Sequence, residues 1–290
     1  EMPPISAEDI SRLEISKPDS SMRLQKRDDR WYIAPQDYPA DTRKVEKMLQ
    51  AVEDLSLTAL VSESENHQRY DLHPEKKITV TAWQDDTLVQ SFAIGKTAPS
   101  FHHTFVALKE DDKVYHAMGN FRNDFDKTVS DLRDKTVLAF HTQDIQQLTV
   151  LKGETKAVFT RNEIPLKVEA PEGSTEADTP PSQFEIVWET GDGHEGDKDK
   201  IERFLHTLSS LSCDSYVEDA EKGDFSQPIY EVRLNGLEAH ALSVFAKKDE
   251  DASVYPATSS ENAYPFYLRK SQAENLMKGP EALVKDTPAP

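Results

Sequence analysis

The histidines of this 290-residue sequence are the side chains best suited to binding a metal ion, and they are densest at His102, His103 and His116. Zinc requires three or four such ligands that converge on one point. Neighbouring residues of a strand point to opposite faces of a sheet, so only one of His102 and His103 can readily join His116. We therefore expect surface or loop histidines here, and the sequence predicts no metal site.

A second polar group, His67, Asp71 and His73, lies in a loop that follows a predicted helix. The corresponding stretch in the second half of the chain contains no histidine. Turn formation explains Asp71 better than metal binding does, because aspartate readily bonds to nearby backbone groups. We expect Tyr70 and Leu72 to pack inward beside it.

The segment from Asp192 to Asp199 has the carboxylates of a calcium-binding loop but not their spacing. An EF-hand loop has glycine at its sixth position and glutamate at its twelfth. Here those positions hold Asp197 and Arg203. We expect a solvated turn that leads into a helix.

Signatures of nucleophilic or nucleotide-dependent chemistry are missing from the sequence. Cys213 is the only cysteine, which excludes an intramolecular disulfide, and its place after an apolar helix indicates a buried thiol. There is no nucleophile elbow, phosphate-binding loop or dinucleotide fingerprint. Among 53 acidic residues, no catalytic carboxylate pair can be singled out. The sequence thus predicts no catalytic, cofactor-binding or metal-binding residue, and no cofactor.

Charge narrows the choice of partner. The 53 acidic residues outnumber the 34 basic ones, which gives a formal net charge of −19. Such a surface repels nucleic-acid phosphates and anionic lipid, so we expect neither as a partner. No run approaches the roughly 20 apolar residues that cross a bilayer. Because the chain begins at Glu1 rather than methionine, we expect a processed or trimmed chain that followed a signal peptide or membrane anchor.

Two amphipathic helices are the elements around which the other segments must be arranged. Residues 41–55 and 197–211 each begin with aspartate, which suits the free amides and partial positive charge of a helix N-terminus. Apolar residues keep the same helical spacing in both. They are Val45, Met48, Leu49, Val52 and Leu55 in the first, and Ile201, Phe204, Leu205, Leu208 and Leu211 in the second.

Strand-like segments occur in the same order around each helix, which predicts an α+β fold of two similar tandem units. We place these units at 1–139 and 140–290. Each is expected to be an antiparallel β-sheet that is packed by one main α-helix. A short closing helix is expected near 121–132 in the first unit and near 271–278 in the second.

One insertion separates otherwise matching patterns. Residues 169–183 are rich in Pro, Glu, Ser and Thr and are expected to form a flexible loop within the second unit. On either side of it the elements correspond, with Trp188 at the place of Trp31. We expect both tryptophans in the cores rather than on a carbohydrate-binding surface.

Short motifs over the first unit and its junction with the second carry a family resemblance. They are Trp31-x-Ile33-x-Pro35, Ala40-Asp41, Tyr70-Asp71-Leu72-x-Pro74, Ile94-Gly95, Phe105-Val106, Val114-Tyr115, and Leu132-Arg133-Asp134-Lys135 with Phe140 and Asp144-Ile145. Together these motifs resemble the domain-of-unknown-function family 4340. One departure is Asp71, where the family pattern often has glycine.

The resemblance implies a bacterial envelope protein with an N-terminal membrane anchor and an extracytoplasmic, periplasmic body. Some members of the family occur with ABC-type transporters, and the resemblance supplies no catalytic residues. We predict a non-enzymatic domain that acts as an accessory or assembly partner of an envelope or membrane protein.

Two other functions remain open at this stage. One is a small-ligand or glycan binding protein that uses the groove between the two units, and the other is a hydrolase. A partner role predicts an exposed apolar patch on one sheet or helix face, and a binder predicts a concave cleft lined by aromatic residues with a few polar groups aimed into it. An enzyme predicts ionisable side chains buried together in such a cleft.

Overall fold

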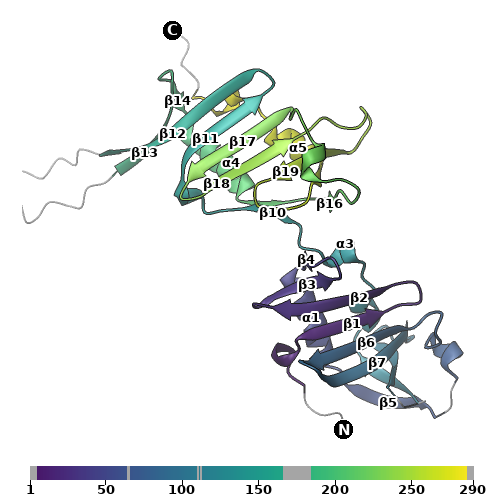
Figure 1. The fold of residues 1–290 in the computed structure, drawn as a ribbon. Coiled ribbons are helices and arrows are strands. Elements are labelled where there is room, and N and C mark those ends of the chain that lie inside the picture. The colour runs from purple at the N-terminus through teal and green to yellow at the C-terminus, as the bar shows by residue number, and fades with distance from the viewer. Residues whose placement is uncertain (1–4, 64–65, 110, 112, 166–183, 286–290) are drawn as a thin grey trace, which may run out of the picture. The chain divides into compact units, whose positions relative to one another are not determined.

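The computed structural model describes residues 5–63, 66–109, 111, 113–165 and 184–285. The chain divides into two compact units, residues 1–134 and 135–290 (Figure 1). Each unit contains one nine-stranded sheet, and the pairings in both sheets are antiparallel. The predicted α+β class with antiparallel sheets is therefore confirmed. The predicted insertion at 169–183 lies outside the described residues.

The sheet of the first unit has the strand order β4-β3-β2-β1-β6-β7-β8-β9-β5. Its strands are β1 (Arg12–Ser16), β2 (Ser21–Arg27), β3 (Arg30–Ala34), β4 (Tyr38–Pro39), β5 (Leu57–Ser62), β6 (Ile78–Gln84), β7 (Thr87–Thr97), β8 (His103–Leu108) and β9 (Val114–Met118). The helical segments are η1 (Ala7–Asp9), α1 (Thr42–Glu53), η2 (His67–Tyr70), α2 (Phe121–Phe125) and α3 (Val129–Leu132), where η denotes a 3₁₀ turn.

The sheet of the second unit has the order β14-β13-β12-β11-β17-β18-β19-β20-β16. Its strands are β11 (Ile145–Lys152), β12 (Thr155–Pro165), β13 (Phe184–Thr190), β14 (Glu195–Gly196), β16 (Ser215–Tyr216), β17 (Tyr230–Gly236), β18 (Ala239–Val244), β19 (Val254–Ser259) and β20 (Phe266–Arg269). A separate pair joins β10 (Thr136–Ala139) to β15 (Ser210–Ser212). The helical segments are η3 (Thr142–Asp144), α4 (Lys198–Leu208), η5 (Lys222–Asp224), α5 (Lys270–Leu276) and η6 (Pro280–Leu283).

The two main helices, α1 and α4, cover one face of their own sheets with the first four residues of each predicted apolar stripe. The helices are shorter than predicted, because Leu55 follows the end of α1 and Leu211 lies in strand β15. Asp41 and Asp197 are the N-cap residues, and each carboxylate accepts a hydrogen bond from an amide of the first turn. All ten predicted apolar residues of the two stripes are buried. Trp31 and Trp188 are 3% and 2% exposed and belong to the two cores, as predicted, and Cys213 is also buried. None of the helices within the described ranges is long and apolar enough to span a bilayer.

Each unit ends with a segment that returns to the N-terminus of its main helix. The amide of Asp41 donates to the carbonyl of Leu132 at 2.7 Å, and the amide of Asp197 donates to that of Leu283 at 2.8 Å. The expected closing helix at 121–132 is in fact two short helices, α2 and α3. They are separate because Thr128 and Asp131 form a capping box that starts α3 anew.

Candidate functional site

The turn between β7 and β8 brings together the histidines that the sequence singled out. The rings of His103 and His116 lie 5.5 Å apart, centroid to centroid, while His102 is exposed. His116 also lies 4.8 Å from Phe105, its partner across the strand pair. This arrangement confirms that only one residue of the adjacent pair faces His116.

The two histidines pack against each other and against Phe105. Among the described residues, no group of three or more His, Cys, Asp or Glu side chains could hold a metal ion. Burial lowers the pKa of His116, and the neighbouring His103 lowers it further. Ser100 Oγ lies 3.1 Å from His103 Nδ1 and fixes the orientation of the second ring.

The most exposed aromatic side chain of the first unit sits on the same turn. Phe101 is 79% exposed, and its φ of +59° lies in the left-handed region that favours glycine. Its amide donates to the carbonyl of Ala98 at 2.9 Å, and the amide of Ala98 donates to the carbonyl of His103 at 2.8 Å. The turn is thus closed by backbone bonds that hold the phenyl ring out in solvent.

A second exposed apolar residue borders this turn. Met118, at the end of β9, is 53% exposed and pairs with His103 across the strands. The amide of the next residue, Gly119, donates to the carbonyl of His102 at 2.9 Å. We call residues 98–103 together with Met118 the β7–β8 tip.

Sequence reasoning found the histidines of the β7–β8 tip but missed Phe101. The available signal was a large apolar residue directly after Pro99-Ser100, a dipeptide typical of turns. An apolar side chain in a turn has no core to enter, so its exposure could have been anticipated.

The loop that contains His67, Asp71 and His73 packs against the sheet of the first unit. Leu72 is 2% exposed and Tyr70 stacks on Phe105 at 4.8 Å, so both pack inward as predicted. Asp71 has a φ of +57°, which explains why the family pattern often has glycine at this place. Its carboxylate lies 3.2 Å from Lys76 Nζ, whereas the sequence predicted a bond to local backbone.

The carboxylates between Asp192 and Asp199 serve a turn and a helix cap. Asp192 accepts a hydrogen bond from the hydroxyl of Thr190 and lies 3.2 Å from His194 Nδ1. These contacts, with Thr190 as the main cause, lower the pKa of Asp192. Asp197 caps α4. The predicted solvated turn before a helix is confirmed.

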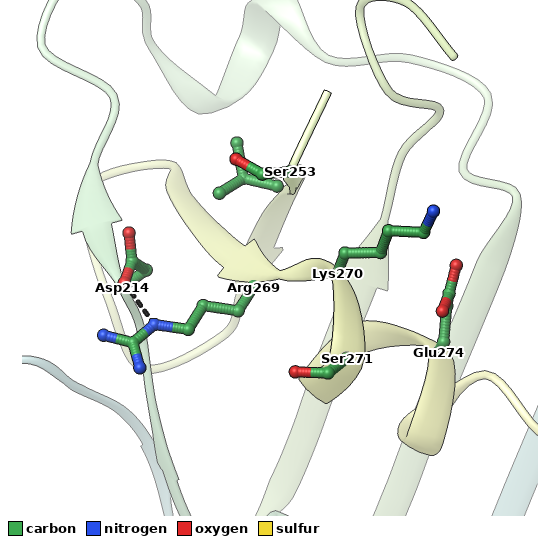
Figure 2. A pocket seen from close by; sticks show the side chains of 7 residues that line it. Asp214, Ser253, Arg269, Lys270, Ser271 and Glu274 are labelled. Atoms are coloured by element: carbon green, nitrogen blue, oxygen red, sulfur yellow. Dashed lines mark hydrogen bonds and ion pairs between the residues drawn. The ribbon is translucent and has the colours of Figure 1, made fainter. Parts of the chain in front are cut away.

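A hollow of about 490 Å³, lined mostly by charged and hydroxyl-bearing residues, lies on the second unit beside the start of α5 (Figure 2). On one side of it, Arg269 Nε pairs with Asp214 Oδ1 at 2.6 Å. Lys270 and Glu274 lie on the other side, as Figure 2 shows. The guanidinium of Arg269 already has a carboxylate partner in Asp214. The rim of this hollow is therefore ion-paired and does not present a set of converging reactive groups.

Comparison with known proteins places the chain in a family. No curated protein and no solved structure matches it. A family model described as a domain of unknown function, DUF4340, matches residues 31–228, from the third strand of the first unit into the second unit. Because this match covers more than half of the 290 residues, the protein belongs to the DUF4340 family.

Proposed function

We propose that this protein is a non-enzymatic, extracytoplasmic domain of a membrane-anchored bacterial envelope protein. It acts as an accessory or assembly partner, and the β7–β8 tip is its contact with that partner. The observation that carries the proposal is Phe101, an aromatic side chain that is 79% exposed on left-handed backbone.

The energetics of Phe101 favour a role in binding over a role in folding. The left-handed conformation costs an L-residue roughly 1–2 kcal/mol relative to right-handed backbone, and glycine avoids most of that cost. An exposed ring gains almost nothing from the hydrophobic effect inside its own unit. Buried in an interface, the same ring can become an anchor worth about 2 kcal/mol or more.

The location and partner class in this proposal come from the family resemblance. Family members resemble envelope proteins, some of which occur with ABC-type transporters, and a transporter component is therefore the partner class we propose. The acidic surface, with a net charge of −19, fits a protein partner better than nucleic acid.

We also propose that the two units are tandem copies of one ancestral unit. Three independent features support this: the same strand order, the same capped main helix, and the same returning segment that bonds to the cap amide. A duplicated scaffold provides two surfaces for assembly, which suits an accessory protein.

Site-specific photo-crosslinking in the producing cells tests the proposal. A photoreactive phenylalanine analogue at position 101 is expected to give a discrete crosslinked product in the membrane fraction. The same analogue at Leu237, which is 82% exposed in the second unit, is the matched control and is expected to give none. Equal products from both positions, or a full-length protein found wholly in the cytosol, would contradict the proposal.

A substitution separates binding from folding. Phe101→Gly relieves the left-handed conformation and removes no buried contact, so stability should be unchanged or up to about 1 kcal/mol higher. Recovery of the partner with the full-length protein should nevertheless fall. A loss of partner with preserved stability identifies a contact residue, whereas an unchanged partner yield removes Phe101 from the interface.

A further inference from the structure

A groove of about 430 Å³ on the helical layer of the second unit has a strongly cationic rim. It is lined on one side by α4 and on the other by α5 and η6. Lys200, Arg203 and Lys278 line it, and its described lining residues include no acid. The floor is apolar and consists of Phe204, Leu276 and Leu283, which are 8%, 1% and 5% exposed. We call this the α4 groove.

Two of the three cations lack a carboxylate within ion-pair distance among the described residues. Lys200 Nζ lies 3.2 Å from the carboxylate of Asp197, the cap of α4. By contrast, among the described residues no carboxylate lies within 4.0 Å of the side-chain nitrogens of Arg203 or Lys278, although the charge of Arg203 helps to lower the pKa of the Asp197 carboxyl. In a protein of net charge −19, it is unusual that three cations line one groove with Asp197 as their one ion-paired carboxylate among the described residues.

The first unit contains the equivalent place, and matching backbone hydrogen bonds define the equivalence. The segment 122–132 follows the same course as 273–283. Corresponding bonds are those from Asp126 to Arg122 and from Met277 to Ala273, both 2.8 Å, and those from Lys127 to Phe125 at 2.9 Å and from Lys278 to Leu276 at 2.8 Å.

In the first unit the chain supplies its own acids. Lys47 of α1 lies 2.7 Å from the carboxylate of Asp124 in α2. Lys44 donates to the backbone carbonyl of Asp131 at 2.5 Å, and its charge helps to lower the pKa of the Asp131 carboxyl, after the larger contribution of Thr128. The cations of α1 thus face two aspartates.

In the second unit the cations are retained but both acids are missing. Lys200 and Arg203 stand at the places of Lys44 and Lys47 on the main helix, counted from the capping aspartate. On the closing segment, Asn275 and Ala282 stand where the first unit has Asp124 and Asp131. The α4 groove is therefore the same structural place without its internal carboxylates.

We infer that the α4 groove binds an acidic segment of a partner protein. A carboxylate of that segment takes the position that Asp124 occupies in the first unit and pairs with Arg203 and Lys278. An adjacent apolar side chain of the segment packs on Phe204. This combination of apolar floor and cationic rim suits a peptide with neighbouring acidic and apolar residues better than a fully hydrated inorganic anion. The α4 groove and the β7–β8 tip belong to different units and would bind different side chains, so binding at the groove does not depend on the proposed function.

Binding of a labelled peptide to the full chain provides the test. The probe is a short fluorescent peptide of alternating leucine and aspartate, and the control probe replaces aspartate by asparagine. Fluorescence anisotropy should detect binding of the acidic peptide alone. Arg203→Gln combined with Lys278→Gln should weaken it about tenfold, the sum of two partly exposed ion pairs. Asn275→Asp, which restores the acid of the first unit, should weaken it by a similar factor without harming the fold.

A charge-matched variant controls for long-range attraction. Lys152→Gln combined with Lys156→Gln removes the same charge from exposed residues of the β11–β12 hairpin and should leave binding unchanged. Equal weakening by this variant, or equal binding of the asparagine peptide, overturns the inference. Displacement of the peptide by inorganic phosphate at similar concentration overturns the peptide assignment in favour of a simple anion site. Self-association that the Arg203 and Lys278 substitutions abolish overturns it in favour of a second copy of the chain.

Discussion

Replacing Gly95 by alanine should destabilise the first unit severely, because the backbone at the end of η2 lies directly against this residue. A Cβ atom at Gly95 would lie 2.2 Å from the carbonyl oxygen of Tyr70 and 3.0 Å from Cγ of Leu72. The oxygen belongs to the backbone, so no change of rotamer can relieve the overlap. The loop must move outward by more than 1 Å to restore an ordinary contact, which lies between 3.4 and 4 Å.

The magnitude follows from what that movement disrupts. Leu72 is 2% exposed, and withdrawing a buried leucine costs about 1.5–3 kcal/mol. Residual overpacking adds about 1 kcal/mol or more. We therefore expect Gly95→Ala to lower the free energy of unfolding by about 2–4 kcal/mol.

Urea unfolding followed by tryptophan fluorescence measures this loss, and hydrogen exchange locates it. Exchange should accelerate in residues 66–77 and in β7. Gly191→Ala is the control, because a Cβ there meets no atom within 4 Å, and it should change stability by less than about 1 kcal/mol. If both substitutions lower the free energy of unfolding equally, the close approach of Tyr70-Asp71-Leu72 to Gly95 is not the reason that glycine is required at position 95.

Three further outcomes are expected. Asp71→Gly should leave stability unchanged or raise it slightly, whereas Asp71→Ala should lower it by about 1 kcal/mol, because φ is +57° there; urea midpoints compare the two. Gly196→Ala should cost about 1–3 kcal/mol by calorimetry, since a Cβ would lie 2.7 Å from the Cδ1 atom of Ile201. Because the pKa of His116 is lowered in the folded state, the unfolded state binds more protons. The stabilising contribution of neutral His116 is therefore present above the ordinary pKa of 6.5 and is lost as the pH falls below that value. The free energy of unfolding of His116→Phe should consequently depend less on pH between 7 and 5 than that of the unsubstituted protein.

The helices and their faces were predictable because the signals for them are local. An aspartate cap and five apolar residues at helical spacing identify α1 and α4 without knowledge of the rest of the chain. The break between α2 and α3 had a local signal as well, in the capping-box residues Thr128 and Asp131. Phe125, Val129 and Leu132 nevertheless fit one continuous apolar stripe, which is why the sequence pattern predicts a single helix near 121–132.

The features of the candidate sites depend on information that is not local. Nothing in the residue type of Phe101 indicates left-handed backbone, which sequence rules assign to glycine or asparagine. Likewise, Lys200 and Arg203 have the pattern of ordinary surface residues on an amphipathic helix. The replacement of an acid on the closing segment becomes visible only when backbone bonds align Asn275 with Asp124.

The proposed duplication gives a physical reason to look for function where the units differ. Two copies with the same strand order must meet the same packing requirements, so differences in the cores are constrained while differences at the surface are free to serve binding. The β7–β8 connection presents Phe101, whereas the equivalent β18–β19 connection is polar and charged from Lys247 to Asp251. The helical layer shows the opposite contrast, since Lys47 of the first unit pairs with Asp124, whereas Arg203 of the second has no carboxylate within ion-pair distance among the described residues. Each unit thus departs from the common scaffold at a different surface, and a partner that contacts both would need an apolar pocket for Phe101 and an acidic segment for the α4 groove.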